Sequence, residues 1–274
     1  MLLNSRLVAL LDMNTQNKKN NSFRLVSLAA SITETLFALD LGDLVVGVTD
    51  TCDHPSEVLN LPNIGCWFEP NLDTLYYLKP DLVIGLDTAH RDLEVSLKKA
   101  GIELKLVNPT TVDQAIESIA ELGSLMGATD TGIIVDGLNT RLKALDESVA
   151  KISRSNRLTA CRILEFDAGE VCVAGPLSFQ YDIITRAGGI NVTPALVEAY
   201  PRVPLEQLGE LDPDLIFYCG YNLEYLEKMM ESQIWGSMRA VKTGRIHRFP
   251  CELTCRFGPR IVDMTELLHQ TLYD

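Results

Sequence analysis

The chain has 274 residues, of which 46% are hydrophobic, so it can bury a sizeable core in one large domain or in two lobes of ordinary size. Its formal net charge of −13 argues against nucleic acid and anionic membrane surfaces as partners, because both are negatively charged. No apolar stretch approaches the roughly 18–20 residues of a transmembrane helix. These properties favour a protein that works in water and docks on a basic partner.

Residues 1–22 are expected to form a flexible lead-in. Their short apolar run, from Leu7 to Leu11, is followed by Asp12, and it is shorter than the ~7–15 residues of a secretory signal core. A degenerate export signal is the alternative interpretation. The residues alone therefore leave the compartment open between extracytoplasmic and cytoplasmic.

Short strands and helices alternate from Phe23 onward. Ser31 is expected to cap a helix that runs to Leu39, with Glu34 at the capping-box position. Such alternation is typical of a mainly parallel sheet covered by helices, and we assign it to an N-terminal α/β lobe over residues 23–128. The expected strands of this lobe are Arg24–Leu28, Leu44–Val48, Asp81–Leu86 and Leu104–Val107.

One phrase occurs twice: Leu75–Ile84 and Leu208–Phe217 both read L-x-x-L-x-P-D-L followed by two large apolar residues. Two leucines one helical turn apart anchor a short helix on a core. The proline ends that helix, and the apolar run is typical of a buried parallel strand. Since each half of the chain carries one copy, the sequence predicts two similar α/β lobes.

A long amphipathic helix from about Thr131 to Ile152 is expected between the two copies, and residues 129–156 are interpreted as the connection between the lobes. The C-terminal α/β lobe then covers residues 157–274. It is expected to include a helix over Leu223–Met230 and a final amphipathic helix that starts at Pro259.

Motifs of enzymes are absent from the sequence. There is no G-x-x-x-x-G-K-[ST] loop, no G-x-G-x-x-G after a strand, no H-E-x-x-H and no G-x-S-x-G. His247 and His269 have no obvious nucleophile nearby in the sequence. We therefore expect no catalysis and nominate no catalytic residue.

Seven cysteines, an odd number, do not describe a disulfide scaffold. Cys161, Cys172 and Cys219 lie in or beside apolar strand-like segments and are interpreted as small buried hydrophobes.

The four other cysteines fall in turns: Cys52, Cys66, Cys251 and Cys255. They leave open a soft-metal or thiol site together with His54, a disulfide such as Cys251–Cys255 or Cys52–Cys66, and unpaired thiols. Because their spacings match no tight zinc pattern, no metal ligand is assigned.

The opening segment Leu25–Glu34, both P-D-L phrases and the G-x-W at Gly65–Trp67 carry a resemblance. They are similar to segments of the helical-backbone (class III) substrate-binding proteins of ABC importers, which serve cobalamin, ferric siderophores and heme. The opening Leu25–Glu34 and both P-D-L phrases are shared by the whole class. The G-x-W of Gly65–Trp67 ahead of Asn71–Asp73 is more particular to the vitamin B12 binders. The resemblance runs from about Arg24 to Leu272. It implies two lobes joined by one long helix, with the ligand in the cleft between them.

The resemblance also implies which residues meet the ligand. Trp67 corresponds to a tryptophan that packs on the corrin, although a core position is the alternative for such a side chain. Thr51 and Leu253 stand where B12 binders carry aromatic side chains, so the site is expected to be looser or to suit another corrinoid. The implied ligand contacts are Ala30, Ser31, Thr51, Trp67, Phe166, Tyr200, Glu252, Leu253 and Arg256.

Two acidic residues match the family positions that grip arginines of the membrane permease, Asp73 in the first lobe and Glu206 in the second. Charge-assisted pairs of this kind give orientation as well as energy. The alternative is that each carboxylate merely favours the start of its helix.

The resemblance thus predicts a monomer that captures cobalamin or a related corrinoid, holds no permanent cofactor and delivers its ligand to an ABC permease. The same fold serving a ferric siderophore or heme is one alternative. A thiol/His metal-binding protein or metallochaperone is an alternative of another class. The family implies an extracytoplasmic location.

Overall fold

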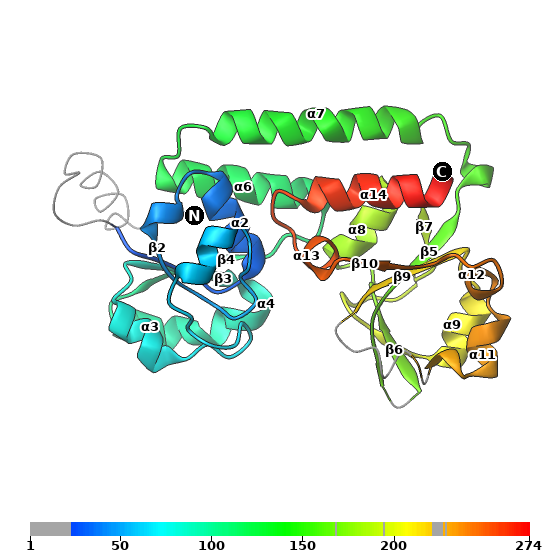
Figure 1. Cartoon of the computed structure of the whole chain (residues 1–274), viewed down its shortest axis with the longest axis horizontal. Helices are drawn as coiled ribbons and strands as arrows, with labels where there is room; N and C mark the ends of the chain where they lie inside the picture. The colour runs from blue at the N-terminus through cyan, green and yellow to red at the C-terminus, as the bar shows by residue number, and fades with distance from the viewer. Residues whose placement is uncertain (1–22, 168, 194, 221–226, 228) are drawn as a thin grey trace. The chain divides into compact units, whose positions relative to one another are not determined.

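The computed structural model describes residues 23–167, 169–193, 195–220, 227 and 229–274 (Figure 1). The chain divides into two compact units. Unit 1 comprises residues up to Asn108 together with Ile116–Gly137, and unit 2 comprises Pro109–Ala115 together with Leu138–Asp274. The expected lead-in and most of the expected helix Leu223–Met230 lie outside the described residues. Among the helices that are described, none is both long and apolar enough to cross a bilayer.

Unit 1 is built on a four-stranded parallel sheet with the order β2-β1-β3-β4. Its strands are β1 (Leu25–Ser27), β2 (Val45–Val48), β3 (Leu82–Leu86) and β4 (Glu103–Val107). The helices that follow in this part of the chain are α2 (Ala30–Ala38), α3 (Leu72–Leu78), α4 (Asp87–His90), α5 (Glu94–Lys99) and α6 (Val112–Met126). The expected parallel sheet with helical connections is therefore confirmed for this unit.

The start of α2 differs from the expectation. The N-cap is Ala29, with an extended backbone and no side-chain cap, and Ser31 lies inside the helix. The reason is that the Ala29 carbonyl already accepts the backbone N–H groups of Ile32 and Thr33 at 3.0 Å. The helix thus begins two residues earlier than a Ser31 cap would allow.

Unit 2 contains a mixed sheet with the order β10-β9-β5-β6-β8, and β7 also pairs with β5. The β9–β10, β5–β9 and β5–β7 ladders are parallel, whereas β5–β6 and β6–β8 are antiparallel. The strands are β5 (Thr159–Asp167), β6 (Glu170–Val173), β7 (Ile190–Asn191), β8 (Arg202–Pro204), β9 (Leu215–Cys219) and β10 (Ile246–Phe249). The helices are α8 (Phe179–Arg186), α9 (Leu205–Leu211), α11 (Gln233–Ser237), α12 (Arg239–Lys242), α13 (Cys251–Thr254) and α14 (Ile261–Tyr273).

The expected long helix is α7 (Thr131–Val149), and the division between the units falls within it, after Gly137. Its apolar stripe is buried as the spacing predicts, at Leu138, Leu142, Leu145 and Val149. In unit 2, α7 runs alongside α14 (Figure 1), where Arg141 pairs with Asp263 and Glu266 at 2.6 Å. That residues 129–156 serve as the connection between lobes stays a prediction.

The structure explains the repeated L-x-x-L-x-P-D-L phrase. In each copy a seven-residue helix, α3 or α9, ends at a left-handed residue, Lys79 (φ 47°) or Asp212 (φ 41°), before the proline. The aspartate that follows then accepts the backbone N–H at the start of a neighbouring strand. Asp81 accepts from Arg24 at 2.9 Å, and Asp214 accepts from Thr159 at 2.8 Å. The phrase therefore ends a helix and, through its aspartate, hydrogen-bonds the start of a neighbouring strand.

We expect Asp214→Ala to lower the free energy of unfolding by about 2–4 kcal/mol, because it leaves the Thr159 backbone N–H and hydroxyl without their acceptor. Asp214→Asn keeps a carbonyl acceptor and should lose less, about 1 kcal/mol. Chemical denaturation of both variants measures the difference. If both variants lost the same free energy of unfolding, Asp214 would not stabilise the fold by accepting these hydrogen bonds.

The same carboxylate should contribute to acid sensitivity. Burial raises the pKa of Asp214, but hydrogen bonds from Thr159 and the Arg239 charge outweigh burial and lower it below its ordinary value. A lowered pKa means that the folded state holds the carboxylate ionised. The stabilisation is therefore complete above the ordinary pKa and is lost as pH falls through the folded value.

Candidate functional site

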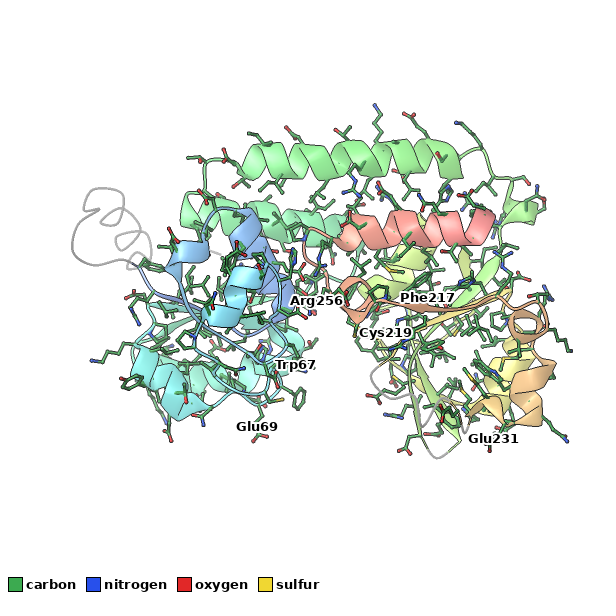
Figure 2. The ribbon with its side chains drawn as sticks, in the orientation of Figure 1. Trp67, Glu69, Phe217, Cys219, Glu231 and Arg256 are labelled. Atoms are coloured by element: carbon green, nitrogen blue, oxygen red, sulfur yellow. The ribbon has the colours of Figure 1, made fainter. Side chains whose placement is uncertain are left out.

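Trp67 lies on a short exposed loop of unit 1 rather than in the core. The loop runs from Gly65 to Pro70, which close it with a β-bridge. Gly65 has φ of 91°, a left-handed conformation that favours glycine, so the turn requires it. Trp67 is 37% exposed and its neighbour Phe68 is 64% exposed, with the two rings edge to face at 5.6 Å. Figure 2 labels Trp67 and Glu69 on this loop. The core alternative for Trp67 is thus excluded.

A buried histidine that the sequence did not single out holds this loop in place. His90 ends α4 and is fully buried. Its Nδ1 accepts the Leu86 backbone N–H at 2.8 Å, so Nε2 carries the proton and donates to the Trp67 carbonyl at 2.6 Å. From the other side, Asp50 accepts the Trp67 backbone N–H at 3.1 Å. Both backbone groups of Trp67 are therefore fixed by side chains.

The neutral ring of His90 is the form that makes both hydrogen bonds. Burial lowers the pKa of His90, against a smaller raising effect of the hydrogen bond to Trp67. Gly85 leaves room for the ring, since a Cβ there would lie 2.9 Å from Nδ1. A proton on Nδ1 would face the Leu86 N–H, so protonation releases that contact.

We expect stability to depend on pH through His90. Because its folded pKa lies below the unfolded value near 6.5, the unfolded state binds the proton more readily. The stabilisation is therefore complete above pH ~6.5 and is lost as pH falls from there through the folded pKa. Thermal unfolding of wild type and His90→Gln between pH 8 and 5 tests this. The variant should show a flatter dependence over that range than wild type, and an unchanged slope would contradict the assignment to His90.

The remaining unit 1 residues expected at the ligand fall into two groups. Ala30 and Ser31 are buried in the first turn of α2, at 7% and 5% exposure, with little side chain to present. Thr51 is exposed. It lies in the turn after β2, next to Asp50, which is the residue that accepts from Trp67. The turn that carries Asp50 and Thr51 therefore contacts the backbone of Trp67.

In unit 2, a buried glutamine brings Tyr200 together with α13. Gln180 on α8 is 4% exposed; its Oε1 accepts the Tyr200 hydroxyl at 2.9 Å, and its Nε2 lies 3.4 Å from the Thr254 carbonyl. Burial raises the pKa of the Tyr200 hydroxyl to about 12, although the residue as a whole is 41% exposed. The hydroxyl therefore stays protonated and anchors the ring, while the exposed face remains available to a ligand.

The Tyr200 side of unit 2 also exposes aliphatic side chains. Val197 is 81% exposed and Leu177 is 57% exposed. Their loops adjoin, since the Gly175 N–H donates to the Ala199 carbonyl at 2.8 Å. A Cβ at Gly175 would lie 2.1 Å from the Glu198 carbonyl oxygen, so only glycine permits this approach. Exposed apolar side chains that gather in this way mark surfaces that bind apolar partners.

The other residues of unit 2 that are expected to contact the ligand differ in how deeply they are buried. Glu252 and Leu253 on α13 are half-buried, and Arg256, which follows α13 and is labelled in Figure 2, is 8% exposed. Phe166 on β5 packs partly against the apolar core of unit 2. The ring of Phe166 is thus shared between the core and the surface.

Three cysteines of unit 2 converge at the carboxyl ends of two adjacent parallel strands. Cys219 is the last residue of β9 and pairs with Phe249 of β10, and Cys251 starts α13 one residue beyond Pro250. Cys255 follows one helical turn later, so its sulfur shares a helix face with that of Cys251. The Sγ separations are 3.2 Å for Cys219–Cys255, 3.2 Å for Cys219–Cys251 and 3.3 Å for Cys251–Cys255.

A buried guanidinium faces these sulfurs. Arg162 in the middle of β5 is fully buried, and its Nη2 lies 3.0 Å from Cys219 Sγ and 3.6 Å from Cys255 Sγ. Hydrogen bonds from Cys251 and Cys255, together with the Arg162 charge, hold the pKa of Cys219 well below its ordinary value. The pKa of Cys251 is raised because its thiol donates to Cys219. The cluster therefore supports at least one thiolate.

The cysteine expectations need two corrections. Cys161 and Cys172 are buried as expected, but Cys219 is half-buried because it ends its strand where the chain leaves the core. Cys52 is buried in unit 1, where the Thr33 hydroxyl lies 3.1 Å from its sulfur, and the exposed Cys66 does not pair with it. All seven cysteines are free thiols in the structure.

The two acids expected to dock on a permease occupy equivalent positions. Asp73 is the second residue of α3 and Glu206 is the second residue of α9, and both are exposed. Asn71 caps α3 by accepting the Thr74 N–H at 2.9 Å, so the Asp73 carboxylate is not used as the cap.

Comparison with known proteins gives a consistent result. Residues 25–253 match the family described as periplasmic binding protein. An uncharacterized ABC transporter substrate-binding lipoprotein, YvrC of Bacillus subtilis, is 29% identical over 263 residues, which cover 93% of this chain and 81% of that protein. The vitamin B12-binding protein of Salmonella typhi is 26% identical over 216 residues, 78% of each chain.

Solved structures share the fold. The crystal structure of Staphylococcus aureus IsdE complexed with heme superposes with a TM-score of 0.80 over 93% of this chain and 100% of that one, at 22% identity. This agreement, together with the family match over most of the sequence, shows that the chain belongs to the periplasmic binding protein family, as a non-enzymatic substrate-binding component of an ABC transporter in the class that serves vitamin B12, heme and iron chelates.

Proposed function

We propose that this protein captures cobalamin or a related corrinoid and delivers it to an ABC permease. The observation that carries the proposal is the half-exposed Trp67, held on the Gly65–Pro70 loop by Asp50 and His90. A corrin macrocycle has an apolar periphery, and a tryptophan ring that is fixed in advance can stack on it with little loss of conformational freedom.

The chemistry of unit 2 supports a ligand that is apolar in part and carries hydrogen-bonding groups. Tyr200 presents an anchored ring beside the exposed Val197 and Leu177. Glu252, half-buried on α13, offers an acceptor to the amide side chains of a corrin. Pockets for small molecules commonly combine an apolar lining with a few placed polar groups, and these residues of unit 2 offer both kinds of group. That the ligand binds between the two lobes stays a prediction.

Heme is the second candidate ligand, because IsdE was crystallised with heme on the same fold. A ferric chelate is the third. One feature favours a corrinoid over heme: the G-x-W segment ahead of Asn71–Asp73. Two groups at the site that are chemically able to ligate heme iron, His90 and the Tyr200 hydroxyl, are already engaged in hydrogen bonds.

Delivery is proposed to use Asp73 and Glu206. Equivalent exposed carboxylates on two equivalent helices can each take one arginine of a permease. Proteins of this family act outside the cytoplasm, and we propose the same for this chain.

Competitive calorimetry tests the choice of ligand. We expect cyanocobalamin to bind with one-to-one stoichiometry and to be displaced by other corrinoids, while hemin and ferric citrate bind at least about tenfold more weakly. Preferential binding of hemin would identify heme as the ligand in place of a corrinoid. Absence of binding by all three would contradict it.

A further inference from the structure

We propose that Cys219, Cys251 and Cys255 form a binding site for one thiophilic divalent cation, with Zn²⁺ as the expected metal. Two parallel strands and the first turn of α13 bring the three sulfurs together within 3.3 Å of one another. Soft thiolate ligands select zinc and similar metals over magnesium or calcium. The site goes beyond corrinoid binding, and either property can be present without the other.

Charge balance favours a divalent ion. Arg162 is fully buried, and among the described residues no carboxylate pairs with it; its nearest acceptors are the Ile163 carbonyl and the sulfurs. A buried cation needs a counter-charge. Three thiolates with a divalent metal carry a net charge of −1, which Arg162 neutralises. A monovalent metal would leave one negative charge in excess, and a trivalent one would leave Arg162 unbalanced.

The geometry fits such an ion with a small adjustment. Zn–S bonds are ~2.3 Å long, so three sulfurs on a tetrahedral zinc lie about 3.8 Å apart. The observed separations of 3.2–3.3 Å therefore need to widen by roughly half an ångström, which side-chain rotation of the half-buried Cys251 and the exposed Cys255 allows.

Convergence of three sulfurs also argues against a macrocyclic metal at this site. The metal of a corrin or heme has only its two axial positions free, so it cannot accept three protein thiolates on one side. A free cation bound by three protein ligands instead keeps a fourth position for water or another small ligand.

The test is titration of the reduced, full-length protein with Cd²⁺ and Zn²⁺. We expect one equivalent of Cd²⁺ to produce an ultraviolet thiolate-to-metal charge-transfer band, and Zn²⁺ to compete for the same site. Cys219→Ser, Cys251→Ser and Cys255→Ser should each weaken binding by at least about 100-fold. Cys66→Ser, at the exposed cysteine of unit 1, is the matched control and should bind normally.

A second measurement does not depend on how the variants fold. X-ray absorption of the zinc-loaded wild type should show three sulfur neighbours at ~2.3 Å. The proposal is overturned by substoichiometric binding, by a zinc environment of oxygen and nitrogen only, or by a disulfide within the cluster that persists under the reducing conditions of the titration. Cyanocobalamin binding is measured separately, so a failure of the metal-site proposal does not contradict corrinoid binding, and the reverse also holds.

Discussion

Trp67→Ala is expected to weaken binding of cyanocobalamin by about 1–3 kcal/mol, or roughly 5- to 150-fold in Kd. The side chain is 37% exposed and its backbone is held by Asp50 and His90, so the mutation removes an anchored stacking surface and leaves no large cavity. The fold should therefore survive, and the loss should appear in affinity. Isothermal titration of the variant gives the measurement.

The matched control for this prediction is Tyr77→Ala. Tyr77 is an aromatic residue of the same unit, 84% exposed on α3, and it lies outside the Trp67 loop. Its loss should leave the affinity within about a factor of two. Trp67→Phe should recover part of the lost affinity, because a flat aromatic face remains. Wild-type affinity in Trp67→Ala would remove Trp67 from the site.

Reversal of charge at both docking acids should disable delivery without affecting capture. Asp73→Lys combined with Glu206→Lys places a cation opposite each expected permease arginine, so attraction becomes repulsion at both positions. We expect uptake through the cognate importer to fall by roughly 10- to 100-fold. Binding of cyanocobalamin to the isolated double variant should be unchanged.

Charge reversals elsewhere separate docking from a general effect of net charge. Glu117→Lys on α6 and Glu231→Lys in unit 2 change the same number of charges at exposed positions outside α3 and α9. They should support normal uptake. If both double variants lose uptake equally, the site of contact is not the helix starts. If neither double variant loses uptake, Asp73 and Glu206 only stabilise the starts of α3 and α9.

The fold was largely predictable because its patterns are local. The L-x-x-L-x-P-D-L phrase indicated a helix, a stop and a buried strand in each half, and α3–β3 and α9–β9 have that arrangement. The function of the aspartate was not predictable in this way. Asp81 and Asp214 accept from Arg24 and Thr159, residues more than fifty positions earlier, and no local pattern marks that partner.

The misses have physical causes. No strand was predicted at Arg202–Pro204, and β8 forms there as an edge strand, where proline is tolerated. Ser31 was expected as a cap although the extended Ala29 already starts the helix. Cys219 was taken for a core residue because the strand before it is apolar, and only the pairing of β9 with β10 brings it to Cys251 and Cys255.

The candidate site was predicted less completely than the fold. Resemblance supplied Trp67 and Tyr200, and both carry exposed rings. His90 and Gln180, which position them, lie 23 and 20 residues away in the chain and carry no sequence signal of that role. Support of this kind arises from packing, so it becomes visible only in three dimensions.

The most direct test uses the Trp235→Phe variant, in which Trp67 is the only tryptophan, since Trp235 is the second of two and is buried in unit 2. Titration with cyanocobalamin should quench the remaining emission and saturate at one equivalent. Emission that stays constant while calorimetry reports binding would show that the corrinoid sits away from Trp67, contrary to this account.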